Sequence, residues 1–255
     1  MDRLKSFVSD FLPDRVLCGA AAVIHLRFEP ELWPLVHRCD PDGLAIDVGA
    51  WLGPWSFWLA RRVERVVAFE PNPDLARLLT KQLPSNVEVH QVAVAEFDGT
   101  AQLTVSGSGR GGEGQSTLGE LAGAHSVLDV RTVSLDSFDF ARVRFLKVDV
   151  EGEELGVLAG ARNLLERWHP VVVVELEDRH GDVADAMKLM ESLGYQGWAM
   201  VERIWRPVDA ARLVELQRAA LAHEPARSYI GTALFRSGHY VNNVVFTHPE
   251  STWLP

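Results

Sequence analysis

Four residues in the first third of the chain have the types and spacing of a nucleoside-binding site. Asp47 precedes Gly49 and Gly53, and Glu70 follows about 20 residues after this glycine turn. Glycine lets a backbone approach a ligand closely, and a carboxylate at a strand end can accept both hydroxyls of a ribose. We therefore expect Glu70 on the ribose and Asp47 beside a cationic group. In the structural alternatives, Asp47 caps a helix and Glu70 pairs with Arg65.

The ligand expected at this site is S-adenosylmethionine rather than a dinucleotide. A dinucleotide-binding turn needs its second glycine where this chain has Trp51, whose bulk would block the approach to a pyrophosphate. The carboxylate of Asp47 suits the amino acid end of S-adenosylmethionine, held directly or through water. Val94 lies among small apolar residues after the third predicted strand and is the candidate for the adenine face.

A second group of polar residues follows two later strands and could serve methyl transfer to an oxygen. An alcohol is a poor nucleophile while it keeps its proton, and a positioned base contributes on the order of 10²- to 10⁴-fold. His180 has an ordinary pKa near neutrality, and Asp149 is expected beside the cofactor's methyl group as a cofactor contact as well. The candidates for the base are Asp149, Glu151, Glu175, Glu177 and His180.

Three of these carboxylates could instead bind Mg²⁺. Asp149, Glu175 and Glu177 should meet at neighbouring strand ends, and Mg²⁺ with oxygen ligands would lower the pKa of an acceptor hydroxyl. Without a metal, the same carboxylates could bind the hydroxyls of a sugar. His180 could equally be an ordinary surface histidine. Lys147 lies inside a predicted strand and should neutralise a carboxylate there.

An α/β fold must position both groups of residues. From residue 44 to residue 174, short β-branched runs alternate with helical patterns, which is typical of βαβ units around a mostly parallel sheet with helices on both faces. Ligands gather at the carboxyl ends of the strands in such a sheet. The predicted strands are Leu44–Val48, Arg65–Phe69, Val87–Val92, Arg144–Val150 and Val171–Glu175, followed by Gly197–Arg206 and Tyr240–Thr247 as late strands, one of them antiparallel. The predicted helices are Pro54–Arg62, Asp74–Gln82, Glu153–Trp168 and Val183–Leu193.

We expect one catalytic domain, residues 43–255, preceded by an N-terminal helical cap, residues 1–42. Residues 106–117, with the sequence SGSGRGGEGQST, are so rich in Gly and Ser that they predict a flexible loop, with a substrate lid as the alternative. Residues 207–238 are expected as an insert between the last two strands, with a helix at Asp209–His223.

Five segments together resemble the FkbM methyltransferase family. They are IDVG with the later glycine at 46–53, FEPNP at 69–73, VAEFDG at 94–99, VSLD at 133–136 and LKVDVEGEE at 146–154. The last, followed by LAGA at 158–161, is the most specific to the family. The resemblance implies a Rossmann-like class I methyltransferase fold in which Asp47, Gly49 and Glu70 bind the cofactor. It also implies O-methylation of a small metabolite, for which we expect a sugar or oligosaccharide, with a polyketide or other natural product as the alternative.

Composition and charge disfavour other partners. The formal net charge is −10, and no run of five or six basic residues occurs, so nucleic acid is not expected as a substrate. No apolar stretch is long enough to cross a bilayer, which predicts a cytoplasmic protein without membrane insertion. Aromatic residues in the late insert make a homodimer plausible. A non-catalytic protein that binds the same cofactor remains the alternative from another class.

Overall fold

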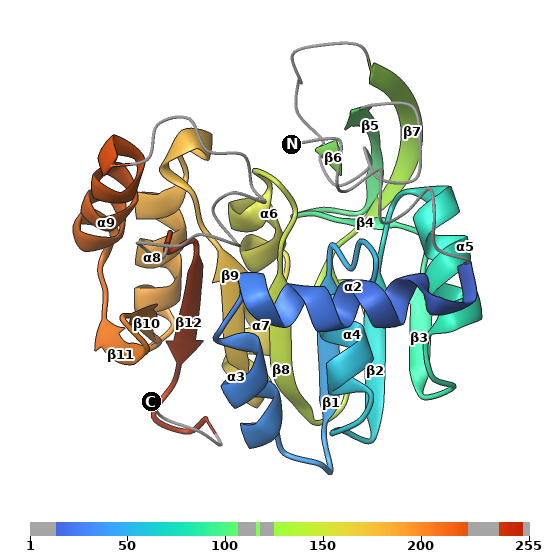
Figure 1. Cartoon of the computed structure of the whole chain (residues 1–255), viewed down its shortest axis with the longest axis horizontal. Helices are drawn as coiled ribbons and strands as arrows, with labels where there is room; N and C mark the ends of the chain where they lie inside the picture. Colours follow the sequence, from blue (N-terminus) through green and yellow to red (C-terminus); the bar gives the residue numbers. More distant parts are fainter. Residues whose placement is uncertain (1–13, 107–115, 118–124, 224–239, 252–255) are drawn as a thin grey trace.

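An eight-stranded sheet forms the centre of the computed structural model, which describes residues 14–106, 116–117, 125–223 and 240–251 (Figure 1). The strand order is β11-β10-β12-β9-β8-β1-β2-β3. The five strands from β9 to β3 are parallel, and β12 runs antiparallel to both of its neighbours. The strands are β1 (Leu44–Val48), β2 (Arg65–Phe69), β3 (Val87–His90), β8 (Val143–Val148), β9 (Val171–Glu175), β10 (Gln196–Val201), β11 (Ile204–Pro207) and β12 (Asn243–Thr247).

Helices cover both faces of this sheet, because successive residues of a strand point to opposite faces and both sets are apolar. Ile46 and Val48 share one core with apolar residues of α6, α7, α8 and α9, while Ala45 shares the other with residues of α3 and α4. The helices are α3 (Leu32–Arg38), α4 (Pro54–Leu59), α5 (Pro73–Gln82), α6 (Glu154–Ala159), α7 (Arg162–Trp168), α8 (Val183–Ser192) and α9 (Ala210–His223).

The predicted N-terminal helical segment contains α2 (Asp14–Phe28) and α3, while residues 1–13 lie outside the described residues. α2 packs across α4 and α5, as Figure 1 shows. Leu17 of α2 is buried against Leu52 and Leu75, and the Trp58 Nε1 donates to the Ala22 carbonyl at 3.0 Å. These two helices are therefore packed onto the same body as the sheet.

The sequence analysis missed a second, four-stranded sheet with the order β4-β7-β5-β6. Its strands are β4 (Ala93–Val94), β5 (Gly99–Ser106), β6 (Ser116–Thr117) and β7 (His125–Val133). β5 and β7 pair antiparallel and project beyond the carboxyl ends of the parallel strands (Figure 1). The flexible loop predicted at 106–117 is thus wrong at its two ends, because Ser106 belongs to β5 and Ser116–Thr117 form β6. Its residues 107–115 lie outside the described residues.

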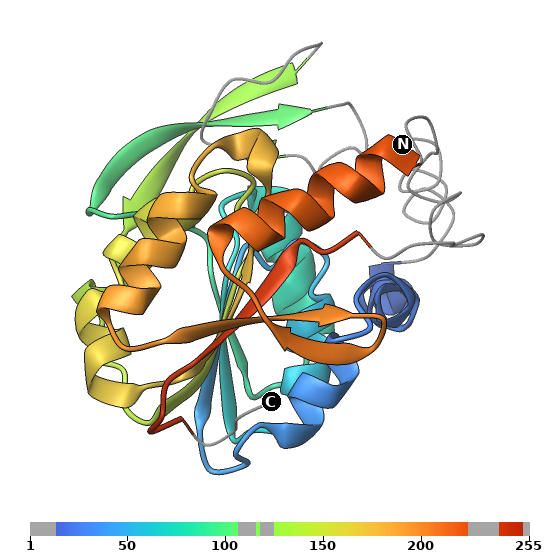
Figure 2. The same cartoon turned by 90° about the vertical axis from the view of Figure 1, so that its left-hand side faces the viewer.

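One predicted late strand is in fact a hairpin. The chain turns at Glu202 and Arg203, both at positive φ (51° and 65°), so residues 197–206 form most of β10 and β11. Two consecutive residues at positive φ match the twist of a tight antiparallel hairpin. The expected insert accordingly begins after Pro207, the last residue of β11, and its residues 224–239 lie outside the described residues. In Figure 2, which faces the β11 edge of the sheet, α9 lies above the hairpin of β10 and β11.

The long helix predicted at 153–168 is divided into α6 and α7. The division falls at Gly160, where an added Cβ would lie 2.4 Å from the Ala95 carbonyl oxygen. The glycine thus allows the chain to approach the Ala95 backbone closely where α6 ends. Within the described ranges, no helix combines the length and apolar character that crossing a membrane requires.

Candidate active site

Asp47 lies at the end of β1 and is almost fully buried, with 2% of its surface exposed. Its Oδ2 accepts hydrogen bonds from the Ser56 backbone N (2.9 Å) and Oγ (2.6 Å) in the first turn of α4. Burial raises the pKa of this carboxyl to about 6, although the Ser56 hydrogen bonds and the charge of Lys147 act in the opposite direction. These contacts of Asp47 are those of the helix-capping alternative. A role of Asp47 toward the cofactor is a proposal.

Gly49 is required by a contact between two strand ends. It has a φ of +78°, and its N donates to the Phe69 carbonyl at 3.0 Å. An added Cβ would lie only 1.7 Å from the Asp149 carbonyl oxygen, which belongs to the turn after β8. The glycine thus lets β1 approach β8, a different reason from the ligand approach that we expected. Gly53, at φ +75°, occupies the position before the first turn of α4.

Glu70 follows β2, and backbone groups hold its buried carboxylate from two sides. Oε2 accepts from the Trp51 N at 2.8 Å and Oε1 accepts from the Asn72 N at 2.9 Å. Arg65, the alternative partner, pairs with Glu88 instead. The carboxylate is therefore fixed between the turn after β1 and the start of α5, whereas Val94 in β4 packs into the main core.

Lys147 is the buried cation at the centre of the site. It is fully buried, and its Nζ donates to the Asn243 Oδ1 at 2.9 Å and lies 3.7 Å from the Asp149 Oδ2. Burial alone would lower its pKa, but the charges of Asp149, Glu29 and other carboxylates raise the pKa above its ordinary value. The expectation that Lys147 neutralises a carboxylate is confirmed.

Two buried glutamates between α2 and α3 reach this centre, and the sequence analysis missed both. Glu29 accepts from the Trp55 Nε1 at 2.6 Å, and the Glu31 Oε1 accepts from the Asn243 Nδ2 at 2.7 Å. Burial and the charge of Glu29 raise the pKa of Glu31 to about 7, whereas His25 and Lys147 overcome burial and hold the pKa of Glu29 at about 2. The only sequence signal was two acidic residues around Pro30 between apolar helices, which does not reveal a partner.

Oxygen atoms that could bind a cation come from three elements. One oxygen each of Glu29, Asp149 and Glu175 can lie within 4.8 Å of the others. Glu177, the third ligand predicted from the sequence, does not belong to this group among the described residues, and its carboxylate pairs with Arg179. Glu175 accepts from the Asn242 Nδ2 at 2.7 Å, and burial together with the charge of Asp149 raises its pKa well above the ordinary value.

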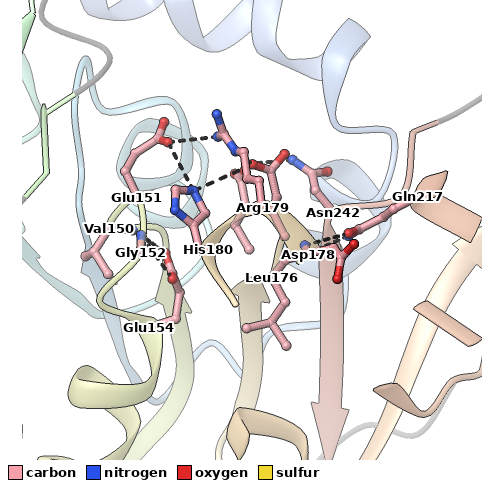
Figure 3. Close-up of polar contacts among 12 residues, drawn as sticks. Val150, Glu151, Gly152, Glu154, Leu176, Asp178, Arg179, His180, Gln217 and Asn242 are labelled. Atoms are coloured by element: carbon pink, nitrogen blue, oxygen red, sulfur yellow. Dashed lines mark hydrogen bonds and ion pairs between the residues drawn. The ribbon is translucent and has the colours of Figure 1, made fainter. Parts of the chain in front are cut away.

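The loop after β9 brings His180 toward the turn after β8 (Figure 3). The His180 Nε2 lies 3.9 Å from the Glu151 Oε2 and 3.8 Å from the Glu177 Oε2. Arg179 donates to the same Glu151 oxygen at 3.0 Å and also pairs with Glu177. Burial and the charge of Arg179 lower the pKa of His180, so the imidazole is neutral at pH 7 and can accept a proton.

A strained turn presents Glu151 to this loop. Glu151 has a φ of +54° and Gly152 a φ of +112°. Both residues follow the end of β8, so their backbone amides are not paired within the sheet. The buried carboxylate of Glu154 accepts from the Val150 N at 3.2 Å and from the Gly152 N at 3.1 Å (Figure 3). A non-glycine residue at positive φ persists only when its surroundings hold it, and here Glu154 does so.

Replacing Glu154 with Gln should loosen this turn. The amide of Gln places an NH₂ donor where the Glu154 Oε2 accepts from the Gly152 N, and we expect a loss of about 1–3 kcal/mol in the free energy of unfolding. Glu166, which is exposed and pairs with Arg162 in α7 at 3.7 Å, provides the control. Glu166→Gln should change stability by less than about 0.5 kcal/mol. Urea denaturation of the variants measures both effects, and equal losses would contradict the account.

Comparison with known proteins identifies the class. Residues 47–196 match the family described as "Methyltransferase FkbM domain". The chain is 29% identical over 197 residues to "Methyltransferase 1" of Beauveria bassiana, which covers 66% of this chain and 78% of that protein. It is 28% identical over 148 residues to the "Hexuronic acid methyltransferase AglP" of Haloferax volcanii, covering 54% and 58%. The solved FkbM methyltransferase of Methylobacillus flagellatus superposes with a TM-score of 0.41 at 14% identity, covering 96% of this chain and 58% of that one.

The fold and the sequence matches define an S-adenosylmethionine-dependent methyltransferase with a mostly parallel sheet and a late antiparallel strand. Since the family match extends over more than half of its residues, the chain belongs to the FkbM methyltransferase family. It spans 58% of the length of both the Haloferax protein and the Methylobacillus structure.

Proposed function

We propose that this protein transfers the methyl group of S-adenosylmethionine to a hydroxyl oxygen of a sugar, with a hexuronic acid as the first acceptor to test. The observation that carries the proposal is the neutral His180 between Glu151 and Glu177, beside the carboxylates at the ends of β8 and β9. A base and several hydrogen-bond acceptors at one place suit a polyol whose hydroxyl must lose a proton. The methyltransferase of hexuronic acid among the relatives directs the choice of sugar.

The buried charge at the centre of the site suits a cationic cofactor. Asp47, Glu29, Asp149 and Glu175 surround Lys147, and the raised pKa values of Asp47 and Glu175 indicate that one lysine does not fully compensate them. S-adenosylmethionine carries a sulfonium and an ammonium, and it supplies the methyl group when bound. We assign its amino acid end to the Asp47 side and its ribose to Glu70, whose carboxylate lies at the end of the neighbouring strand. The turn at Gly49 and Gly53 and the backbone near Val94 would complete the cofactor site.

In this proposal, the residues that take up the hydroxyl proton lie on the acceptor side of the site. The acceptor oxygen forms the new bond to carbon while the carbon–sulfur bond breaks and the sulfur keeps that electron pair. The hydroxyl proton passes to His180 or to Glu175, whose raised pKa makes it a stronger base than an ordinary carboxylate. Glu151 lies beside His180, and the exposed Arg179 offers a cation for the carboxylate of a hexuronic acid.

The oxygens of Glu29, Asp149 and Glu175 fit a hard cation such as Mg²⁺ in type. However, the Lys147 ammonium already lies 3.7 Å from Asp149, and a divalent ion placed there would be repelled by it. We therefore propose that Lys147 supplies the positive charge that a metal would otherwise supply. Mg²⁺ dependence is the alternative, in which EDTA removes activity and added Mg²⁺ restores it.

A panel of acceptors tests the proposed function. The protein, S-adenosylmethionine and each sugar are incubated with either EDTA or Mg²⁺, and methylated products are detected by mass spectrometry. The panel pairs hexuronic acids with the matching neutral hexoses and includes a polyketide alcohol. We expect methylation of a sugar hydroxyl in EDTA, with Arg179→Ala weakening the preference for the hexuronic acid over its hexose. A product with only the polyketide would redirect the proposal, and no product with cofactor bound would support the non-catalytic alternative.

Affinity for S-adenosylmethionine should fall with decreasing pH. Asp47 must be ionised to attract the cofactor's cationic end, and its pKa of about 6 implies a loss of up to about tenfold per pH unit below 6. Calorimetric titration between pH 8 and pH 5 measures this slope. Asp47→Asn should bind weakly with a flatter pH dependence, whereas Asp185→Asn, an exposed residue of α8 that pairs with Lys188, should behave like wild type. An unchanged slope in Asp47→Asn would remove Asp47 from the cofactor site.

A further inference from the structure

A single buried glutamine connects α9 to the loop that carries His180. Gln217 is fully buried, and its Nε2 donates to the Leu176 carbonyl at 2.7 Å and to the Val241 carbonyl at 2.9 Å. Its Oε1 accepts from the Asp178 N at 2.8 Å, as Figure 3 shows. One side chain thus satisfies three backbone groups from two separate segments.

The points that Gln217 fixes lie on either side of Glu177. Leu176 is the first residue after β9, and Asp178 begins the short helical turn that ends at His180. The carboxylate of Asp178 also pairs with Arg218, the next residue of α9, at 2.9 Å. The backbone of this loop is therefore held from the helix, while the side chains of Arg179 and His180 point toward Glu151.

Packing alone does not explain an amide at this position. The neighbouring helix position Leu213 is fully buried in the main core, and an apolar side chain at 217 would avoid the cost of burying an amide. A buried amide is favourable only where its partners are fixed in place, and without it these three backbone groups would lose their hydrogen-bond partner. The benefit of Gln217 is a defined loop conformation.

We propose that Gln217 is a positioning residue for the acceptor half of the site. It holds the 176–178 backbone so that Glu177 and His180 face Glu151, which makes α9 an element of acceptor recognition. This inference rests on the proposed function, because that function places His180 on the acceptor side.

Two substitutions at position 217 and one matched control test the inference. Gln217→Leu removes all three hydrogen bonds, and Gln217→Glu keeps an acceptor for the Asp178 N but loses both donors at neutral pH. Leu213→Ala destabilises the same helix through lost packing while leaving Gln217 in place. Hydrogen exchange measures the Asp178 amide, trypsin probes cleavage after Arg179, and NMR follows the titration of the His180 imidazole. Calorimetry measures binding of S-adenosylhomocysteine.

We expect the Asp178 amide to exchange at least about tenfold faster in Gln217→Leu than in wild type, with faster cleavage after Arg179. The pKa of His180 should rise toward its ordinary value, because the imidazole is no longer held in its buried position beside Arg179. Gln217→Glu should regain protection as the pH falls, since a protonated carboxyl can donate again. Leu213→Ala should show none of these local changes, and S-adenosylhomocysteine should bind all variants alike.

An unchanged Asp178 amide and an unchanged His180 titration in Gln217→Leu would overturn the inference. The same local changes in Leu213→Ala would also overturn it, because the effect would then follow from global stability. With an acceptor found by the panel, the acceptor KM should rise in Gln217→Leu. If no acceptor is methylated, the proposed function fails while the exchange and NMR results still decide whether Gln217 holds the loop.

Discussion

Gly49→Ala should abolish the proposed cofactor site and strongly destabilise the protein. The new Cβ would lie 1.7 Å from the Asp149 carbonyl oxygen, and the residue would have to keep a φ of +78°. The left-handed conformation costs alanine about 1–2 kcal/mol, and the overlap with fixed backbone adds about 1–3 kcal/mol or more as β1 and β8 separate. Thermal denaturation and titration with S-adenosylmethionine should show a large fall in Tm and no measurable binding.

Gly181 provides the control that separates strain from overlap. It has a φ of +86°, and nothing lies within 4 Å of an added Cβ. Gly181→Ala should therefore cost only the conformational part, about 1–2 kcal/mol, and should retain cofactor binding. Comparable losses in the two variants would show that the close approach of Gly49 to Asp149 is not the decisive contact.

Lys147→Met should destabilise the protein by about 3–5 kcal/mol at pH 8, because it leaves the buried carboxylate of Glu29 and the partly buried carboxylates of Asp149 and Glu175 without their cation. The loss should shrink as the pH falls. Lys147 lowers the pKa of Glu29 and of Glu175, so its removal raises both folded-state pKa values, and protonation of these two carboxyls then contributes stability at low pH. That contribution is lost as the pH rises through the folded-state pKa values.

Urea denaturation from pH 5 to pH 8 measures this pH dependence. Lys188 is the matched control, because its ammonium is exposed and pairs with Asp185 in α8, at 3.0 Å. Lys188→Met should change stability by less than about 0.5 kcal/mol at every pH. A Lys147→Met variant with wild-type stability at pH 8 would contradict the charge arrangement proposed for the site.

The parallel strands could be predicted because each is a short apolar run with a clear end. The predicted bounds of β1, β2 and β9 are those of the structure, since both faces of these strands are buried and polar residues or turns follow at once. β5 was missed although Ala101, Leu103 and Val105 alternate with polar residues, which is the period of a strand. Its partner β7 lies beyond a long Gly-rich segment, so the sequence does not indicate which strand β5 pairs with.

The residues of the candidate site likewise fall into those that could be predicted from the sequence and those that could not. Asp149, Glu175 and His180 could be predicted because they follow strands whose order brings their ends together. Glu29 and Gln217 could not, because Glu29 lies in the turn between α2 and α3 and Gln217 lies in α9, both far in sequence from the residues that they contact. Their roles depend on tertiary contacts, for which an acidic or amide residue in a helical segment gives no signal.

The most direct test of the account is a single-turnover measurement with S-adenosylmethionine that carries a deuterated methyl group. Wild type and His180→Gln are each mixed in excess with the sugar acceptor found by the panel, and the product is analysed by mass spectrometry. The account predicts that wild type places the label on a sugar oxygen, while His180→Gln binds the cofactor normally and transfers the label on the order of 10²-fold more slowly. Equal transfer rates with equal cofactor affinity, or a label on an atom other than oxygen, would contradict it.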